Sequence, residues 1–442
     1  MPEQKPREIA YDVLAERARA MGHTEDLLQS KLERSTLKPA DRGLCQELVY
    51  GVARRQRTLD WLIERKAPGK RQVQGIQDAL RLGLYQLFWL DRVPDHAAVY
   101  ETVNLVRAHG MQGLSGFVNA VLRRYSAERD ATLALLSSMR ETDPGIAFSH
   151  PDWMIRRWKA RWGWPDTLKL LEWNNETPKV YARVNSIKAT SNETIERWKS
   201  EAVAYEEIGR DWVPSETVYR LANTPGLMRL ESFRRGFYYI QDPSTLLAPT
   251  LLDPKAEETV LDFCSAPGGK TTFMAQLARN LARIVALDTD ETRLALVREN
   301  CERLGVHHVT SLTPEQFSQR HQGQLFEKVL VDAPCSNTGV LRRRVDVRWR
   351  ISPEGIDSQA TEQLKILAAA ASHTRNGGTV VYSTCSLEPE ENRAVVDAFL
   401  AENPGFSLQS DRELTPMRDE VDGAYVAVLK KGLKTGRTAT PA

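Results

Sequence analysis

The C-terminal half of the chain alternates short apolar segments with amphipathic ones, and this alternation constrains the fold more than any other feature. The strand-like segments are residues 259–264, 283–288, 328–332 and 379–385. The helix-like segments between them are 270–278, 291–305 and 359–371, the last closed by Gly377 and Gly378. Strands that alternate with crossover helices form a mostly parallel sheet covered on both faces. Residues 236–431 therefore predict an α/β domain of the Rossmann-like type, whose ligands bind beyond the carboxyl ends of the strands.

The residues before this domain divide into two further parts. Apolar residues recur at spacings of three and four through residues 1–140, which predicts an all-α domain. The segment ETDPGIAFSHPDW that follows is rich in proline and glycine and marks a domain boundary. Residues 141–235 are predicted to form a linker and a small α+β module, because from residue 151 they mix an amphipathic helix with short strands. We expect residues 432–442 to form a disordered basic tail.

Composition narrows the class of protein. A chain of 442 residues is expected to form two or three domains. Its N-terminus lacks the apolar stretch of a signal peptide, and no apolar run approaches the roughly 18 residues that span a membrane, so we expect a cytoplasmic protein. The five cysteines show no zinc or C-x-x-C spacing, which favours core residues or nucleophiles over disulfides and predicts no metal site. A net charge of +2 neither requires nor excludes nucleic acid.

The sequence DFCSAPGGKTT joins a predicted strand to a predicted helix through a loop with two glycines. It is not a phosphate-binding Walker A loop, because Cys264 stands where that motif requires glycine, and Gly-x-Gly-x-x-Gly is absent. The backbone at Gly268 and Gly269 can approach a ligand at the positive end of a helix. Asp288 ends the next strand, where carboxylates accept hydrogen bonds from ribose hydroxyls. A nucleoside ligand fits this combination: S-adenosylmethionine is the leading candidate, and NAD is an alternative that the missing third glycine disfavours.

Two other predicted strands run into cysteine motifs, Asp332-Ala-Pro-Cys335 and Ser-Thr-Cys385-Ser. A single thiol is usually a small buried hydrophobe, which is our interpretation of Cys45 and Cys301. Two thiols and an acid at strand ends instead match methylation of carbon 5 of cytosine. In that reaction a thiolate adds to carbon 6 while an acid protonates nitrogen 3, and a second base removes the carbon 5 proton. We therefore expect the two sulfur atoms to converge on one cavity.

A basic cluster, RRRVDVRWR, follows the strand that ends at Asp332. A run of charges is usually a solvated face, but here Trp349 is interleaved with the arginines beside the predicted site. We therefore interpret the cluster as a rim that binds the backbone of a polyanion and whose positive field favours a thiolate. The candidate RNA-binding residues are Arg342, Arg343, Arg344 and Arg348, with Arg54 and Arg55 from the helical domain.

Together these motifs resemble the RNA cytosine-5 methyltransferases of the RsmB/Sun (Fmu) and NOL1/NOP2 group. The segments PKVYARVNSIKAT, SFRRGFYYIQDPSTLLAP and YSTCSLEPEEN look like those of the group. The helical N-terminus, with LVYGVARRQRTLDWLI and FVNAVLRR, is similar to the NusB-like RNA-binding domain of the RsmB branch. The resemblance implies that Cys385 is the nucleophile, that Cys335 aids product release, and that Asp332 belongs to the active site. It also implies small-subunit (16S) ribosomal RNA as the substrate, and we expect a monomer.

The resemblance also assigns the cofactor site. The loop expected to hold the methionine end of S-adenosylmethionine consists of Cys264, Ser265, Ala266, Pro267, Gly268, Gly269 and Lys270. Asp288 is expected to bind the ribose, and Asp332 to lie against the cofactor. Two departures stand out. Thr313 occupies the place of an acid that contributes to adenine recognition, with Glu315 as a substitute, and Arg-Arg-Val-Asp at 343–346 replaces Arg-His-Pro-Asp.

Two other functions remain open from the sequence. A non-catalytic RNA-binding ribosome assembly factor, built on a decayed methyltransferase scaffold, would account for the altered adenine segment and the helical N-terminus. Absence of S-adenosylmethionine binding would favour it. A thiol redox enzyme is weaker, because the two cysteines lie 50 positions apart and have no resolving motif.

Overall fold

The computed structural model describes residues 5–17, 24–69, 72–222, 224 and 226–433. The chain divides into two compact units: residues 1–177 with 341–350, and residues 178–340 with 351–442. The second unit contains both the middle module and the α/β domain, and a ten-residue segment leaves it to join the first. The tail predicted at 432–442 lies outside the described residues from position 434 onward.

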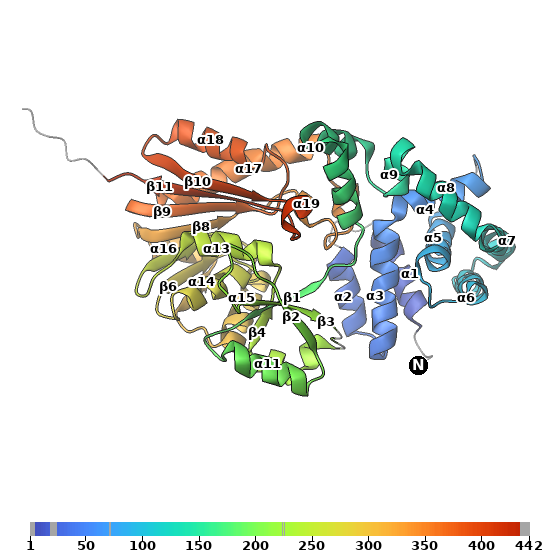
Figure 1. Ribbon diagram of the computed structural model, residues 1–442, viewed down its shortest axis with the longest axis horizontal. Coiled ribbons are helices and arrows are strands. Elements are labelled where there is room, and N and C mark those ends of the chain that lie inside the picture. The colour runs from blue at the N-terminus through green and yellow to red at the C-terminus, as the bar shows by residue number, and fades with distance from the viewer. Residues whose placement is uncertain (1–4, 18–23, 70–71, 223, 225, 434–442) are drawn as a thin grey trace, which may run out of the picture. The chain divides into compact units, whose positions relative to one another are not determined.

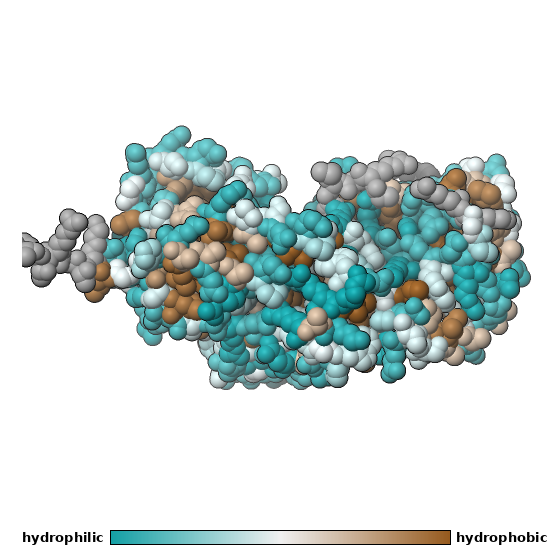
Figure 2. Space-filling model, turned by 90° about the horizontal axis from the view of Figure 1, so that it is seen from above, coloured by the Kyte–Doolittle hydropathy of each residue, from teal (hydrophilic) through white to brown (hydrophobic). Residues whose placement is uncertain are grey.

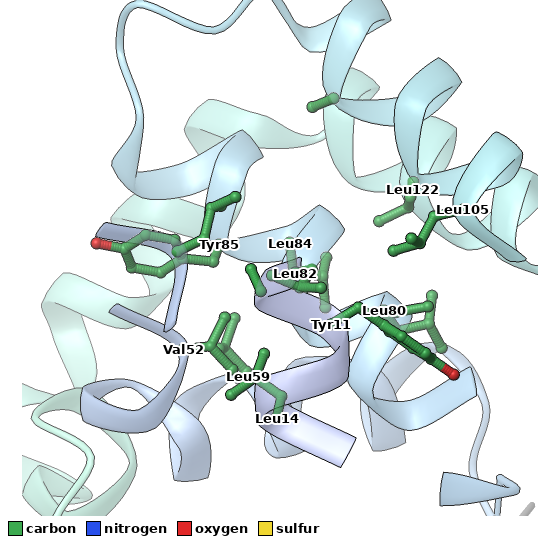
Figure 3. Packing of buried hydrophobic residues seen from close by; sticks show 14 of the residues in the cluster. Tyr11, Leu14, Val52, Leu59, Leu80, Leu82, Leu84, Tyr85, Leu105 and Leu122 are labelled. Atoms are coloured by element: carbon green, nitrogen blue, oxygen red, sulfur yellow. The ribbon is translucent and has the colours of Figure 1, made fainter. Parts of the chain in front are cut away.

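The first unit is helical, as predicted. Its helices are α1 (Pro6–Arg17), α2 (Thr24–Glu33), α3 (Pro39–Arg54), α4 (Gln56–Lys66), α5 (Gln74–Trp89), α6 (Asp95–Ala108), α7 (Ser115–Ala127), α8 (Arg129–Thr142), α9 (Pro144–Ala147) and α10 (Asp152–Trp173). Figure 3 shows leucines, valines and tyrosines from several of these helices converging in one core. A Cβ atom at Gly51 in α3 would lie 1.9 Å from the Tyr85 ring, so this ring of α5 packs directly against the α3 backbone where the residue is glycine.

The first unit continues beyond the boundary expected near residue 141. The hydroxyl of Thr58 donates to the Ile146 carbonyl at 2.5 Å, and the guanidinium of Arg57 donates to the His150 carbonyl at 2.6 Å. These bonds fasten the proline- and glycine-rich segment to α4. Helix α10 changes direction at Gly163, which has a φ of 74°. The unit ends only after α10, at Thr177.

The middle module is an antiparallel sheet with the strand order β2-β3-β1-β4. Its elements are β1 (Val180–Val184), α11 (Ser191–Ser200), β2 (Ala204–Glu207), β3 (Val218–Ala222), α12 (Glu231–Arg234) and β4 (Tyr238–Ile240). Helix α11 begins with a capping box, in which the Thr190 hydroxyl accepts from the Glu193 amide and the Glu193 carboxylate accepts from the Thr190 amide. Its Trp198 is buried against the rings of Tyr219 and Tyr238.

The α/β domain contains a seven-stranded sheet with the order β10-β11-β9-β8-β5-β6-β7. The strands are β5 (Thr259–Asp262), β6 (Arg283–Leu287), β7 (Val309–Leu312), β8 (Phe326–Asp332), β9 (Thr374–Thr384), β10 (Phe406–Leu414) and β11 (Ala424–Lys431). Neighbours from β9 to β7 are parallel, whereas β11 is antiparallel to both β9 and β10. The predicted mostly parallel sheet is confirmed.

Helices cover both faces of this sheet (Figure 1). One face carries α13 (Leu247–Leu252), α14 (Gly269–Leu277) and α15 (Glu291–Leu304), and the other carries α16 (Pro314–Arg320), α17 (Pro353–Ser372) and α18 (Arg393–Glu402); α19 (Pro416–Asp419) precedes β11. The prediction that Gly377 and Gly378 close α17 is wrong. The helix ends at Ser372, because Thr374 already pairs with Phe326 of β8, and both glycines lie within β9.

The face of the molecule seen in Figure 2 is largely polar. On the face seen in Figure 2, hydrophilic residues predominate and hydrophobic ones form scattered patches. Within the described ranges, none of the helices combines the length and the apolar character needed to cross a membrane.

Candidate active site

The two cysteine motifs meet at the ends of neighbouring strands. Strands β8 and β9 are parallel, and their last paired residues are Asp332 and Ser383. The chain then turns so that the thiols of Cys335 and Cys385 share a hydrogen bond, with 3.2 Å between the sulfur atoms. The expected convergence of the two sulfur atoms is confirmed. We call these residues the cysteine pair.

Asn337 is a neighbour of the cysteine pair that the sequence analysis did not single out. The Cys385 thiol donates to its Oδ1 at 3.1 Å, and its Nδ2 donates to the Cys335 carbonyl at 2.7 Å. Its φ of 58° lies in the left-handed region, which asparagine tolerates better than most residues. The Asn in the sequence Pro-Cys-Ser-Asn was the available signal for such a turn.

An ion pair brings the cofactor loop to the chemical site. Lys270 Nζ lies 2.5 Å from Asp332 Oδ2, and the Ser383 hydroxyl donates to the other oxygen at 3.3 Å. Burial alone would lower the pKa of Lys270, but the charge and hydrogen bond of Asp332 and the charge of Cys385 outweigh burial and raise it. The ammonium therefore stays protonated beside both the Asp332 carboxylate and the Cys385 thiol.

The predicted cofactor loop connects β5 to α14 and lies beside the end of β6. The Ser265 amide donates to the Leu287 carbonyl at 2.8 Å, and the Ala266 amide donates to Asp288 Oδ2 at 3.2 Å. Gly268 has a φ of 96°, and a Cβ there would meet Val297 of α15 at 3.2 Å. Asp288 is thus brought to the loop, as predicted, and is 8% exposed.

The middle module supports this loop through Arg183, which the sequence analysis also missed. Its guanidinium is buried and donates to the Gly269 carbonyl at 2.8 Å, to Gln241 Oε1 at 2.7 Å and to Thr272 Oγ1 at 3.0 Å. Burial lowers the pKa of Arg183 to about 9. A side chain of β1 therefore fixes the first turn of α14.

Two residues predicted to lie at the cofactor, Cys264 and Thr313, also have features that relate to the fold. Burial raises the pKa of the Cys264 thiol, which disfavours it as a nucleophile. Thr313 follows β7, whose last residue pairs with Leu287 of β6, so it lies at the same sheet edge as Asp288. Its hydroxyl accepts from the Gln316 amide at 3.4 Å and so caps α16, while Glu315 is exposed in the first turn.

The basic cluster is only partly the exposed rim that the sequence predicts. Arg342 and Arg348 are completely buried and Arg54 is 5% exposed, so the prediction that these three side chains contact RNA phosphates is corrected. Backbone carbonyls explain the burial: Arg348 donates to Ser149 and Asn174 oxygens at 3.2 and 2.8 Å. Arg342 lies instead over the Trp173 ring at 3.7 Å.

The three other arginines retain exposure. Arg343 and Arg344 are half-buried, as is Arg55, whose guanidinium lies over the Trp89 ring at 5.4 Å. Arg344 also lies 3.7 Å from Glu25. These three side chains remain candidates for RNA contact.

Comparison with known proteins agrees with this architecture. The family model described as "16S rRNA methyltransferase RsmB/F" matches residues 249–430, the NusB family model matches 4–127, and the ferredoxin-like domain of RsmF/B-like methyltransferases matches 150–211. A probable ribosomal RNA small subunit methyltransferase B of Bacillus subtilis is 33% identical and covers 92% of this chain and 90% of its own. A probable counterpart from Synechocystis is 34% identical, with coverages of 96% and 99%.

The chain belongs to the RsmB/F family of 16S rRNA methyltransferases. It is accordingly a methyltransferase whose methyl donor is S-adenosylmethionine.

Solved structures agree with the RsmB/F fold. The crystal structure named PH0851 superposes with a TM-score of 0.78 at 22% identity and covers 97% of this chain and 99% of its own, which supports the fold alone. A methyltransferase homologue from Pyrococcus horikoshii has a TM-score of 0.57 at 28% identity, over 65% of this chain and 98% of its own. The predicted arrangement of NusB-like, small α+β and methyltransferase domains is therefore confirmed.

Proposed function

We propose that this RsmB/F family member forms 5-methylcytosine in small-subunit ribosomal RNA through a covalent bond between Cys385 and carbon 6 of the base. The observation that carries the proposal is the cysteine pair, with 3.2 Å between its sulfur atoms, beside the ion pair of Lys270 and Asp332. One thiol can attack the ring and the other can remove a proton only if both reach the same pyrimidine. Their hydrogen bond meets that requirement.

Each step has a residue of this chain to perform it. The Cys385 thiolate adds to carbon 6, and nitrogen 3 receives a proton from the Lys270–Asp332 pair, so that carbon 5 gains enamine character. S-adenosylmethionine, when bound, would supply an electrophilic methyl group to carbon 5 and would leave as S-adenosylhomocysteine. Cys335, as a thiolate that has lost its own proton to solvent, then accepts the carbon 5 proton. The carbon 6–sulfur bond breaks, Cys385 leaves as a thiolate, nitrogen 3 returns its proton to the Lys270–Asp332 pair, and the double bond of the methylated base is restored.

The two thiols are suited to different roles. The hydrogen bond with Cys385 and burial both raise the pKa of Cys335 well above the ordinary value for cysteine. Cys335 is therefore disfavoured as the attacking thiolate, whereas its thiolate, once the thiol proton has been lost to solvent, is a strong base that suits removal of the carbon 5 proton. Cys385, beside the Lys270 ammonium, is left as the nucleophile.

The residues of the cofactor loop fit S-adenosylmethionine chemically. Asp288 accepts one backbone amide on each oxygen, from Ala266 and Asp290, both at 3.2 Å, and a carboxylate has acceptor capacity for two further donors. Ribose hydroxyls would use that capacity. The amino end of α14 and Lys270 provide positive potential for the carboxylate of the methionine group. Thr313 and Glu315 complete the proposed adenine side.

RNA contact is proposed for the exposed part of the basic cluster. Arg343, Arg344 and Arg55 can place charge on phosphates, which is the main source of nucleic-acid affinity. The NusB-like helices supply the rest of the proposed RNA-binding surface. The assembly-factor alternative has no observation in its favour.

Cysteine variants test the proposal. We expect C335A, incubated with S-adenosylmethionine and small-subunit ribosomal RNA, to accumulate a denaturation-resistant protein–RNA adduct, because product release is blocked. We expect C385A to form neither adduct nor 5-methylcytosine, and C45A, which changes a buried thiol of α3, to retain activity. The measurements are gel shift under denaturing conditions and bisulfite sequencing. Native rates in both C335A and C385A would refute the mechanism.

A further inference from the structure

A single buried carboxylate joins the two loops that carry the cysteine pair. We propose that Glu391 is a positioning residue for methyl transfer: it ties the residue after Cys335 to the residue after Cys385 and so sets the separation of the two sulfur atoms. The inference rests on the proposed function, because the separation matters only if both thiols serve one base. Glu391 follows the second cysteine by six positions and precedes α18.

The first arm of the arrangement holds the Cys335 loop. The Ser336 amide donates to Glu391 Oε1 at 2.7 Å, and the Ser336 hydroxyl donates to Oε2. Gln363 of α17 adds a second tie, because its Nε2 donates both to Glu391 Oε1 at 3.1 Å and to the Pro334 carbonyl at 2.8 Å. The residues on both sides of Cys335 are therefore fixed by one hydrogen-bond network.

The second arm holds the Cys385 loop. The Ser386 hydroxyl donates to Glu391 Oε2, the same oxygen that accepts from Ser336. Asn392, the next residue, accepts from the Thr384 hydroxyl at 2.6 Å and donates to the Ser386 carbonyl at 2.9 Å. Cys385 is thus held on both sides by consecutive residues, and Oε2 of Glu391 is shared between the loops of the two thiols.

The burial of Glu391 indicates that its role is positional. The side chain has no exposed surface, and the donors to its carboxylate within the described part of the chain are uncharged groups. Burial raises its pKa, while the hydrogen bonds from both serines and Gln363 act in the opposite direction. A buried carboxylate without a cation is costly. An acceptor that takes four donors at once is what two converging loops require, and a neutral side chain offers less acceptor capacity.

The proposal can be tested without the methylation reaction, because the rate of disulfide formation between Cys335 and Cys385 depends on how the two sulfur atoms are positioned. Diamide takes two electrons and two protons from a pair of thiols, which become a disulfide. Because the sulfur atoms are adjacent, we expect a Cys335–Cys385 disulfide to form fast in the unaltered chain. Mass spectrometry measures the rate of its formation. We expect E391A to slow it by about ten-fold or more, since positioning errors near 1 Å cost factors of that order or larger.

Graded variants separate positioning from loss of the fold. E391Q keeps the shape and one carbonyl acceptor, so we expect an intermediate rate of disulfide formation. S336A and S386A each remove one hydroxyl donor to Glu391 Oε2, and adding either to E391A should have little further effect, because the shared acceptor is already gone. E402Q, which changes an exposed carboxylate at the end of α18, is the matched control, and its disulfide should form at the rate of the unaltered chain.

Kinetics supply the second readout. We expect E391Q to lower kcat for methylation while KM for S-adenosylmethionine and the melting temperature stay near those of E402Q. Unaltered disulfide formation in both E391A and E391Q would overturn the proposal, and so would a loss of kcat without slower disulfide formation. If E391A slows disulfide formation but the unaltered enzyme methylates no cytosine, the positioning role stands and the proposed function fails.

Discussion

Asp262, the last residue of β5, is buried beside the cofactor loop with half of its carboxylate unsatisfied. The Thr271 hydroxyl donates to Oδ2 at 2.6 Å, whereas Oδ1 has no hydrogen-bond partner among the described residues. Burial raises the pKa of Asp262 from an ordinary 3.8 to about 7, against the opposing effect of the Thr271 hydrogen bond. The folded protein therefore holds a proton on this carboxyl group over a range of pH in which the unfolded chain has released it.

This difference predicts a pH dependence of stability. Between pH 3.8 and about 7 the folded state binds more protons at Asp262 than the unfolded state does, so its contribution to stability falls as pH rises. A shift of about three pKa units corresponds to at most about 4 kcal/mol. We expect D262N, which keeps an acceptor for Thr271, to lose less stability than the unaltered chain between pH 4 and pH 8.

Urea unfolding at several pH values measures the effect. D357N, which changes an exposed aspartate of α17, is the control and should follow the unaltered chain. Parallel pH curves for D262N and D357N would contradict the prediction.

Only some residues of the candidate site can be predicted from their positions in the sequence. Asp288, Cys335 and Cys385 could be predicted, because each lies at or just beyond the end of a parallel strand, and such ends share one edge of the sheet. Glu391 could not, because its partner Ser336 lies 55 positions away and no spacing links them. Arg183 could not be predicted for a similar reason. An arginine in a strand is usually a surface charge, and nothing in the sequence indicates that its guanidinium donates to the Gly269 carbonyl.

At the scale of elements, α16 gives a local role to Thr313, which stands where the resemblance leads us to expect an acid. Thr313 caps the helix through a capping box with Gln316, whose side chain accepts from the Thr313 amide at 3.1 Å. Helix α16 has only seven residues, and of these Phe317 is buried, so its end contributes much of its stability. The residue that replaces the expected acid is therefore well suited to begin a helix.

Substitution at this cap tests the assignment. We expect T313A to lower the free energy of unfolding by about 0.5–2 kcal/mol, the usual cost of removing an N-cap oxygen. T313D should retain stability, because aspartate caps as well as threonine does. Urea unfolding of both variants measures the difference, and equal stability of T313A and the unaltered chain would show that the cap is dispensable.

At the scale of the whole molecule, the sequence predicted the succession of domains but not the path of the chain between them. Periodicity identified the helical part and the alternating part, because each repeats over many residues. The segment 341–350 carried no such signal: its arginines predict an exposed rim, whereas the chain leaves the second unit after Val340, buries Leu341 and Arg348 in the first, and returns at Ile351. The burial of this segment depends on contacts with residues distant in sequence, such as the bonds from Arg348 to the Ser149 and Asn174 carbonyls.

The same segment leads to a prediction for the first unit. Asp346 is buried and accepts from the amide and hydroxyl of Thr24 at 3.2 and 3.1 Å, at the start of α2. Arg348 donates to the Ser149 and Asn174 carbonyls and, at 3.1 Å, to Asn175 Oδ1. Residues 341–350 thus connect the start of α2 with the chain on both sides of α10.

Removing one of these buried donors should weaken the unit far more than removing an exposed one. We expect R348A to lower the free energy of unfolding by about 2–4 kcal/mol, because it leaves buried oxygens without donors and opens a cavity. R344A breaks only a half-exposed ion pair with Glu25 and should cost less than about 1 kcal/mol. Thermal and urea unfolding compare the two variants. If R348A proves no more destabilising than R344A, the segment is not an integral part of the helical unit, and Arg348 returns to the list of candidate RNA contacts.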